Sequence, residues 1–145
     1  EDAKINCGYM PQMYDEALDV HRTPVDFLTR DGTGEEHTRI RTYLGSLNFT
    51  PEEMLRPIQS LSGGQKAKLY FAKMIFDRNQ FLILDEPTRN LSPLSGPEIR
   101  QALLDFTGGI LAVSHDRAFI EDVFDEVYLL TPHGLRWVAP EDYTE

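Results

Sequence analysis

The feature that most constrains the fold is the apolar run Phe81–Leu84, which is too short for a typical helix and contains no polar residue. A helical pattern over residues 63–77 precedes this run, and a second helical pattern over residues 95–106 follows it. Another apolar run, Gly109–Val113, comes next. Alternation of helices with unbroken apolar strands predicts an α/β fold, in which helices cover both faces of a parallel sheet.

The N-terminal part of the chain has a different character. The stretch Ile5–Met10 reads as a buried strand that ends at Pro11, because proline donates no hydrogen bond to a sheet. Residues 15–61 carry helical signals only. We therefore expect a first strand with its exit at 1–14, a small helical subdomain at 15–61, and an α/β core at 62–145 that closes with a short helix and a hairpin.

Helix starts within the subdomain are recognisable from their caps. Thr23 before Pro24 predicts one helix, and Thr33 with Glu36 has the spacing of a capping box. The helix after Thr33 is expected to bury one face. That face consists of Ile40, Tyr43, Leu44 and Leu47, and one further turn is signalled by Thr50, Pro51 and Glu53.

Composition excludes several classes of protein. The 145 residues suffice for one domain, and no apolar stretch approaches the ~18 residues that span a bilayer. Residues 1–20 carry no signal-peptide pattern, and a single cysteine, Cys7, excludes an internal disulfide. These features predict a cytoplasmic protein with no direct membrane insertion, in which Cys7 is a small buried packing residue rather than a reactive thiol.

The net charge of −10 opposes non-specific binding to nucleic acid, because such binding depends largely on lysine and arginine contacts with phosphates. Four basic residues do cluster weakly along the chain, at Lys66, Lys68, Lys73 and Arg78. We interpret this cluster as a solvated helix face rather than an RNA-binding patch.

Two carboxylates follow the first apolar run. Asp85 and Glu86 would stand at the carboxyl end of their strand, where open parallel sheets bind ligands. There Asp85 would hold Mg²⁺, directly or through water, and Glu86 would polarise an attacking water. The alternative is a pair of solvated acids, and the Asp-Glu pair alone does not decide between the two interpretations.

The segment Leu61–Gln65, with sequence LSGGQ, opens the next helix. Ser62 and Gln65 have capping-box spacing, which explains these two residues without any ligand. Gly63 and Gly64 remain unexplained, since each costs about 1 kcal/mol relative to alanine in a helix interior. Glycines at a helix start let a ligand approach free N–H groups that favour an anion, so the segment predicts a phosphate-contacting helix start.

Two more polar residues follow strands. His115 comes after Gly109–Val113, and Gln12 comes after the first strand. A lone histidine at such a position is usually a satisfied surface or core residue, and a lone glutamine indicates nothing. Beside a carboxylate, however, His115 would contact a terminal phosphate and orient the water next to Glu86.

Taken in order, the segments GYMPQ, LSGGQ, FLILDEPT and SHDR resemble the Q-loop, signature, Walker B and H-loop motifs of ABC-family ATPases. The resemblance covers nearly the whole chain, and LSGGQ is its most specific part. LSGGQKAKL together with SHDRAFI is most similar to the ABC-F branch, whose soluble members have paired ATPase domains and no transmembrane segments. Many of them act at the ribosome, as translation factors or in antibiotic resistance.

This resemblance implies ATP and Mg²⁺ as cofactors of the full-length protein and a role for each matching residue. Asp85 and Gln12 would hold Mg²⁺, Glu86 would be the catalytic base, and His115 would meet the γ-phosphate. Gln12 would also link the metal and water to the helical subdomain. A head-to-tail partner ABC domain would hold the ATP contacted by the signature residues Ser62, Gly63, Gly64 and Gln65.

Two departures from the family pattern set further expectations. The chain contains no glycine-rich loop ending in Gly-Lys-Ser/Thr, and only 11 residues precede Gln12. We therefore expect the C-terminal portion of an ABC ATPase domain, which needs the missing N-terminal half of the same domain and binds ATP weakly alone. Ser92 stands where the family usually carries the D-loop aspartate.

Two other functions suit the same motifs. One is the ATP-binding subunit of an ABC membrane transporter, whose helical subdomain receives a helix from a transmembrane partner. The other is a non-catalytic module that lends its signature helix to ATP bound elsewhere. The first depends on what precedes the chain, and the second depends on whether Glu86 takes part in hydrolysis.

Overall fold

The computed structural model describes residues 4–89, 91 and 96–143. Its centre is a three-stranded parallel sheet with the order β1 (Cys7–Met10), β2 (Phe81–Asp85) and β3 (Gly109–Val113). In the register of this sheet Met10 lies opposite Leu84, and Asp85 lies opposite Val113. The predicted parallel α/β sheet is therefore confirmed, and all three strands end at the same edge.

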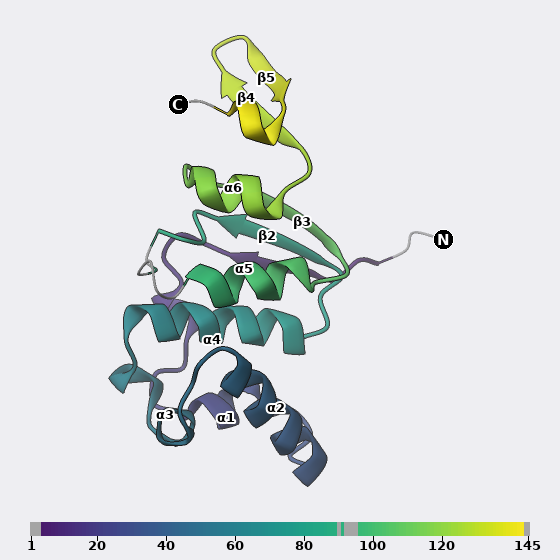
Figure 1. The fold of residues 1–145 in the computed structure, drawn as a ribbon. Helices are drawn as coiled ribbons and strands as arrows, with labels where there is room; N and C mark the ends of the chain where they lie inside the picture. The colour runs from purple at the N-terminus through teal and green to yellow at the C-terminus, as the bar shows by residue number, and fades with distance from the viewer. Residues whose placement is uncertain (1–3, 90, 92–95, 144–145) are drawn as a thin grey trace.

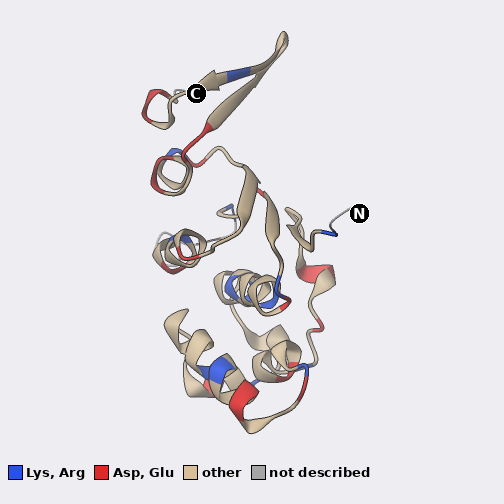
Figure 2. Cartoon of the chain, turned by 90° about the vertical axis from the view of Figure 1, so that its right-hand side faces the viewer, with Lys and Arg blue, Asp and Glu red and all other residues tan. Residues whose placement is uncertain are grey.

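Helices cover one face of this sheet. Helix α4 (Gly63–Phe76) precedes β2, α5 (Gly96–Leu104) precedes β3, and α6 (Arg117–Val123) follows it. Figure 2 shows α5 and α6 on one side of the strands. The side chains that point toward the helices are almost completely buried, with exposures of 1% or less for Met10, Leu82 and Leu84.

The opposite face of the sheet is open among the described residues, so the expectation of helices on both faces is wrong for this part of the chain. Tyr9, Leu111 and Val113 are 53%, 58% and 60% exposed. Cys7 is exposed as well and is not the buried packing residue that its apolar surroundings predicted. It lies on the open face with Tyr9, because side chains two positions apart in a strand share a face.

Below the sheet, three helices form a small group against α4 (Figure 1). They are α1 (Pro24–Leu28), α2 (Gly34–Ser46) and α3 (Pro51–Leu55). Each begins at a threonine whose hydroxyl accepts a hydrogen bond from the backbone N–H three residues later. Their shared core contains Leu28, Ile40, Leu44 and Ile58, all with no exposed surface.

The predicted capping box of Thr33 and Glu36 forms only in part. Thr33 accepts from the N–H of Glu36 at 3.1 Å, but the Glu36 side chain does not reach back to Thr33. Its carboxylate instead accepts from the N–H groups of the preceding loop, at 2.8, 2.8 and 2.7 Å from Arg30, Asp31 and Gly32. Three N–H donors stabilise the carboxylate more than the single N–H of Thr33 would, so the Glu36 side chain binds the loop and does not complete the capping box.

The interpretation of the basic residues of α4 as a solvated face is wrong for Lys68. Lys68 is 4% exposed, and its ammonium group donates to the carbonyl of Leu47 at 3.1 Å. The same nitrogen lies 3.7 Å from a carboxylate oxygen of Glu98 in α5. The Asn48 amide also donates to Glu98. Lys68 therefore joins α4 to the end of α2 and to α5.

The C-terminal part is the predicted hairpin. Strands β4 (Val127–Thr131) and β5 (Gly134–Val138) are antiparallel and, within the described part of the chain, pair only with each other. They pack on α6 through a small second core of Ile120, Val127 and Tyr143. Short 3₁₀ turns occur at Asp15–Ala17, Ile58–Ser60 and Pro140–Asp142. None of the helices in the described ranges has the length and apolar character needed to cross a bilayer.

Candidate functional site

Glu86 and His115 meet at the carboxyl edge of the sheet. The Nε2 atom of His115 lies 3.4 Å from Oε1 of Glu86, and the backbone N–H of His115 donates to Oε2 at 3.4 Å. The Glu86 side chain is 13% exposed and the His115 side chain is 79% exposed. The carboxylate is therefore sheltered, whereas the imidazole remains open to a ligand.

Glu86 has a strained backbone conformation. Its N–H donates to the carbonyl of Val113 at 2.8 Å, which extends the ladder between β2 and β3 by one bond. Its φ angle is 49°, in the left-handed region, and such a conformation costs about 1–3 kcal/mol at a residue other than glycine. Strain of this kind persists only where the surrounding structure enforces it, and it is concentrated at functional sites.

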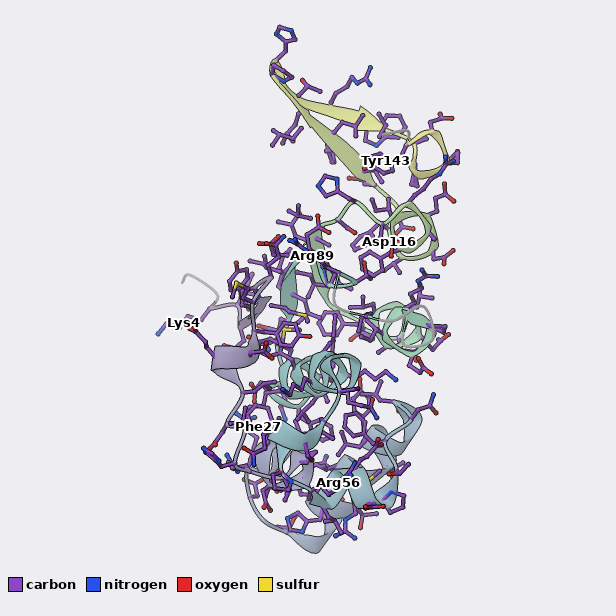
Figure 3. The ribbon with its side chains drawn as sticks, turned by 90° about the vertical axis from the view of Figure 1, so that its left-hand side faces the viewer. Lys4, Phe27, Arg56, Arg89, Asp116 and Tyr143 are labelled. Atoms are coloured by element: carbon purple, nitrogen blue, oxygen red, sulfur yellow. The ribbon has the colours of Figure 1, made fainter. Side chains whose placement is uncertain are left out.

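His115 sits in a short turn that is fixed on its other side. The N–H of Asp116 donates to the Ser114 hydroxyl at 3.0 Å, and the Asp116 carboxylate caps α6 by accepting from Phe119 N–H at 3.1 Å. Figure 3 looks onto this edge, where Arg89 and Asp116 mark the segments that follow β2 and β3. The position of His115 is thus determined by the start of α6.

Asp85 and Gln12 lie at the same edge. Asp85 is the last residue of β2 and is partly exposed, and Gln12 is exposed two residues after Met10, where β1 ends. Among these four sequence-predicted residues, the described hydrogen-bonding contacts are those between Glu86 and His115. The sheet therefore brings the four residues to one edge and pairs two of them.

The segment Leu61–Gln65 lies at the start of α4. Ser62 is the N-cap, and its hydroxyl accepts from the N–H of Gln65 at 3.2 Å. The Gln65 side chain does not complete the capping box; its amide donates instead to Glu53 of α3 at 3.1 Å. Ser62 and Gly63 are exposed, and Gly64 and Gln65 are partly exposed, so the helix start is accessible.

Two tyrosines that the sequence did not single out connect the first strand to α4. The Tyr14 hydroxyl donates to the carbonyl of Gly63 at 3.4 Å, and the Tyr70 hydroxyl donates to the carbonyl of Tyr9 at 2.7 Å. Their rings lie 5.5 Å apart. The segment carrying Gln12 is therefore joined to the helix start that carries Ser62. No local pattern signals this link, because its partners are 49 and 61 residues apart.

The described residues contain no group of three or more His, Cys, Asp or Glu side chains that could hold a metal ion. Asp85 and Gln12 nevertheless offer the oxygen donors that Mg²⁺ prefers. Magnesium is commonly bound through one or two carboxylates together with substrate phosphates, rather than by a complete protein cage. The donors at this edge suit Mg²⁺ that arrives with a phosphorylated ligand.

Comparison with known proteins decides the family. The model of the family described as ABC transporter matches residues 1–89. The chain belongs to the ABC transporter family. Its relatives include members of the ABC-F branch: it is 37% identical to ATP-binding cassette sub-family F member 3 of Homo sapiens over 131 residues, or 90% of this chain. It is also 37% identical over 142 residues, or 97% of this chain, to the protein YdiF of Bacillus subtilis.

Solved structures show the same fold. The dimeric structure of a post-hydrolysis state of the ATP-binding cassette MJ0796, bound to ADP and Pi, matches 96% of this chain with a TM-score of 0.75 and 18% identity. The chain has the fold of part of an ABC ATPase domain. It spans 22% of YdiF and 18% of the human relative, and 65% of the MJ0796 chain.

Proposed function

We propose that this ABC chain carries the hydrolytic groups of an ATPase site in an ABC-F protein, with Glu86 as the catalytic base. The contact between Glu86 and His115 at the carboxyl edge of a parallel sheet is the observation that supports this role. A sheltered carboxylate held on both oxygens has a defined orientation, which a base needs in order to accept a proton from one positioned water.

In this proposal the two residues divide the work. The Glu86 carboxylate accepts a proton from the attacking water, and the backbone N–H of His115 fixes the carboxylate while it does so. The exposed imidazole of His115 donates toward a γ-phosphate oxygen of ATP. Because positioning and charge stabilisation account for most of the catalysis of phosphoryl transfer, a small movement of either group would slow the reaction strongly.

Asp85 and Gln12 are the residues proposed to hold Mg²⁺. When bound, the metal would neutralise charge on the phosphate oxygens. Gln12 would respond to the ligand, and the hydrogen bond from Tyr14 to Gly63 would carry that response to the start of α4. The helical group of residues 15–61 would then follow the state of the nucleotide.

We propose that a missing N-terminal half of the domain completes the fold and supplies most of the binding for ATP. The open apolar face with Tyr9, Leu111 and Val113 supports this, because a monomeric protein rarely leaves such a surface uncovered. The strand edges also support it. Both β3 and β4 have one strand partner in the described structure, so each has an unpaired edge to which a further strand could add.

The start of α4 is proposed to serve a second ATP. Ser62, Gly63, Gly64 and Gln65 would contact the γ-phosphate of ATP held by a partner ABC domain in a head-to-tail dimer. The accessible helix start supports this assignment, since free N–H groups at a helix N-terminus favour an anion. The similarity of LSGGQKAKL and SHDRAFI to the ABC-F branch is the basis on which we further propose action in the cytoplasm and at the ribosome, in translation or in antibiotic resistance.

Steady-state ATP hydrolysis by the full-length protein tests the proposal. Glu86→Gln is expected to lower kcat by about a hundredfold or more, as the loss of a general base typically does. Turnover within a few-fold of wild type would remove Glu86 from the mechanism. If Ser62→Arg abolished turnover while Glu86→Gln retained it, the chain would be a non-catalytic module whose α4 start contacts ATP bound by another domain.

A further inference from the structure

A pocket far from the proposed ATPase site gathers three arginines. It has a volume of about 380 Å³ and lies between α2 and the C-terminal end of α4. Its lining includes Arg30 from the loop before α2, Arg39 from α2 and Arg78 from the loop after α4. Helix α4 has 14 residues and is therefore about 20 Å long, which separates this pocket from Ser62 at the other end.

The arginines are only partly engaged by the protein. Arg30 donates to the carbonyl of Phe76 at 3.4 Å. Arg39 and Arg78 are exposed, and their guanidinium groups have no hydrogen-bond or ion-pair partner among the described residues. The other basic residues of α4 do not join them, because Lys68 is buried against Glu98 and Lys73 pairs with Asp77 at 2.9 Å. Only Arg78 of the basic cluster seen in the sequence reaches this pocket.

Two carboxylates also line the pocket, and they differ in whether the protein already engages their oxygens. Glu36 already accepts three backbone N–H bonds from residues 30–32, so its oxygens are engaged by the loop. Asp31 is exposed and is the only other acid in the lining. Three guanidinium groups against two carboxylates leave the pocket positive, although the whole chain carries a net charge of −10.

Tyr43 also lines the pocket. The rings of Tyr43 and Phe76 contact edge-on, with their centroids 5.5 Å apart. Burial and, as the smaller cause, the nearby negative charge of Asp105 raise the pKa of the Tyr43 hydroxyl. The hydroxyl therefore stays protonated and can donate a hydrogen bond. The pocket thus combines a neutral donor with planar guanidinium groups, whose paired N–H groups match the oxygens of a phosphate.

The backbone at Arg78 adds a second observation. Arg78 follows the C-cap of α4 and has a φ angle of 57°, a left-handed conformation that glycine or asparagine usually supplies at this position. Retaining arginine there costs backbone energy, and the side chain lines the pocket.

We propose that the pocket of Arg30, Arg39 and Arg78 binds a phosphate group, separately from the ATPase site. The phosphate belongs either to a small phosphorylated ligand or to the backbone of a single-stranded nucleic acid. Binding in both cases depends on Arg39 and Arg78, whose guanidinium groups are free to form charge-assisted hydrogen bonds.

Titration of the full-length protein with pyrophosphate and with a short single-stranded RNA, at low salt, tests this site. Arg39→Gln and Arg78→Gly are each expected to weaken binding of at least one probe about tenfold, the loss expected for one charge-assisted contact. Glycine suits the φ angle at position 78, so Arg78→Gly is expected to keep or raise stability while it loses binding. Arg41→Gln, also exposed on α2 but outside the pocket, is the matched control.

The two probes identify the source of the phosphate. A tenfold loss of affinity for pyrophosphate alone supports a small phosphorylated ligand. A loss of affinity for RNA, together with a weaker dependence of that affinity on salt concentration, supports a nucleic-acid backbone. The proposal is overturned if Arg39→Gln and Arg78→Gly bind both probes as tightly as wild type and Arg41→Gln. It is equally overturned if neither probe binds the wild-type protein.

Discussion

The carboxylate of Glu86 is held by two nitrogens of a single residue, His115, one from its backbone and one from its ring, each at 3.4 Å. This arrangement separates two functions of the histidine. The backbone N–H can position Glu86 whatever the side chain is, whereas the exposed ring contacts Glu86 through Nε2 and remains open to a ligand on its other side. Substitutions of the ring should therefore leave the carboxylate in place.

His115→Ala is accordingly expected to lower ATP turnover of the full-length protein by about a hundredfold while its thermal stability stays close to wild type, since a 79% exposed side chain contributes little to folding. Hydrolysis assays and a thermal melt check this. His133→Ala, an exposed histidine in the hairpin turn, is the control and should leave turnover unchanged. Normal turnover in His115→Ala would show that the ring has no part in hydrolysis.

Ser62→Asp separates the capping role of Ser62 from its proposed phosphate contact. Aspartate caps a helix about as well as serine, whereas Ser62→Ala is expected to cost about 1 kcal/mol of stability. The added negative charge would repel a γ-phosphate, so Ser62→Asp should keep its stability and lose at least about tenfold in turnover. Wild-type turnover in Ser62→Asp would leave Ser62 as a cap only.

Lys68 is expected to be essential for the junction of α4 with α2 and α5. Lys68→Met would leave Glu98 partly buried without its cation, and removing one partner of such a pair costs about 3 kcal/mol. Urea unfolding measures this, with Lys66→Met, on the more exposed first turn of α4, as a control expected within about 0.5 kcal/mol of wild type. The double variant Lys68→Met with Glu98→Gln should recover part of the loss. An unchanged midpoint for Lys68→Met would contradict this role.

Glu36 should make stability depend on pH. Burial raises the pKa of its carboxyl, but the N–H groups of Arg30, Gly32 and Asp31 lower it, and the net pKa lies below its ordinary value. A lowered folded-state pKa gives stability that is fully present above the unfolded pKa of glutamate, about 4.3, and is lost as pH falls through the folded value. Glu36→Gln removes this contribution.

The unfolding midpoint of Glu36→Gln should therefore lie below that of wild type at neutral pH, and the gap should narrow as the pH falls below about 4.3. Glu35→Gln, exposed on the same helical turn, is the matched control and should change little. A gap that stays constant down to the acid end of the titration would contradict the role of the carboxylate.

Local patterns predicted most of the secondary structure. Unbroken apolar runs predicted β2 and β3, threonine caps predicted α1, α2 and α3, and the closing hairpin was expected as well. The family motifs also placed four polar residues where strands end, because parallel strands share their carboxyl edge. Ser92, which stands where the family usually carries an aspartate, lies outside the described residues.

Competition for partners explains what local patterns missed. Glu36 and Gln65 both have capping-box spacing. The Glu36 side chain instead accepts hydrogen bonds from the loop 30–32, and the Gln65 side chain donates to Glu53. An apolar strand pattern predicts that a face is buried, but it does not tell which segment of the protein covers that face. Cys7 and Tyr9 were therefore expected to be buried, although no described residue covers their face of the sheet. Links between distant residues, such as Tyr14 with Gly63, have no local signature.

The most direct test of the central claim is a single-turnover measurement on the full-length protein loaded with Mg-ATP. If Glu86 is the catalytic base, Glu86→Gln should still bind ATP with near wild-type affinity and should release almost entirely unhydrolysed ATP after wild type has converted its ATP to ADP and phosphate. Conversion to ADP at the wild-type rate in Glu86→Gln would contradict the account.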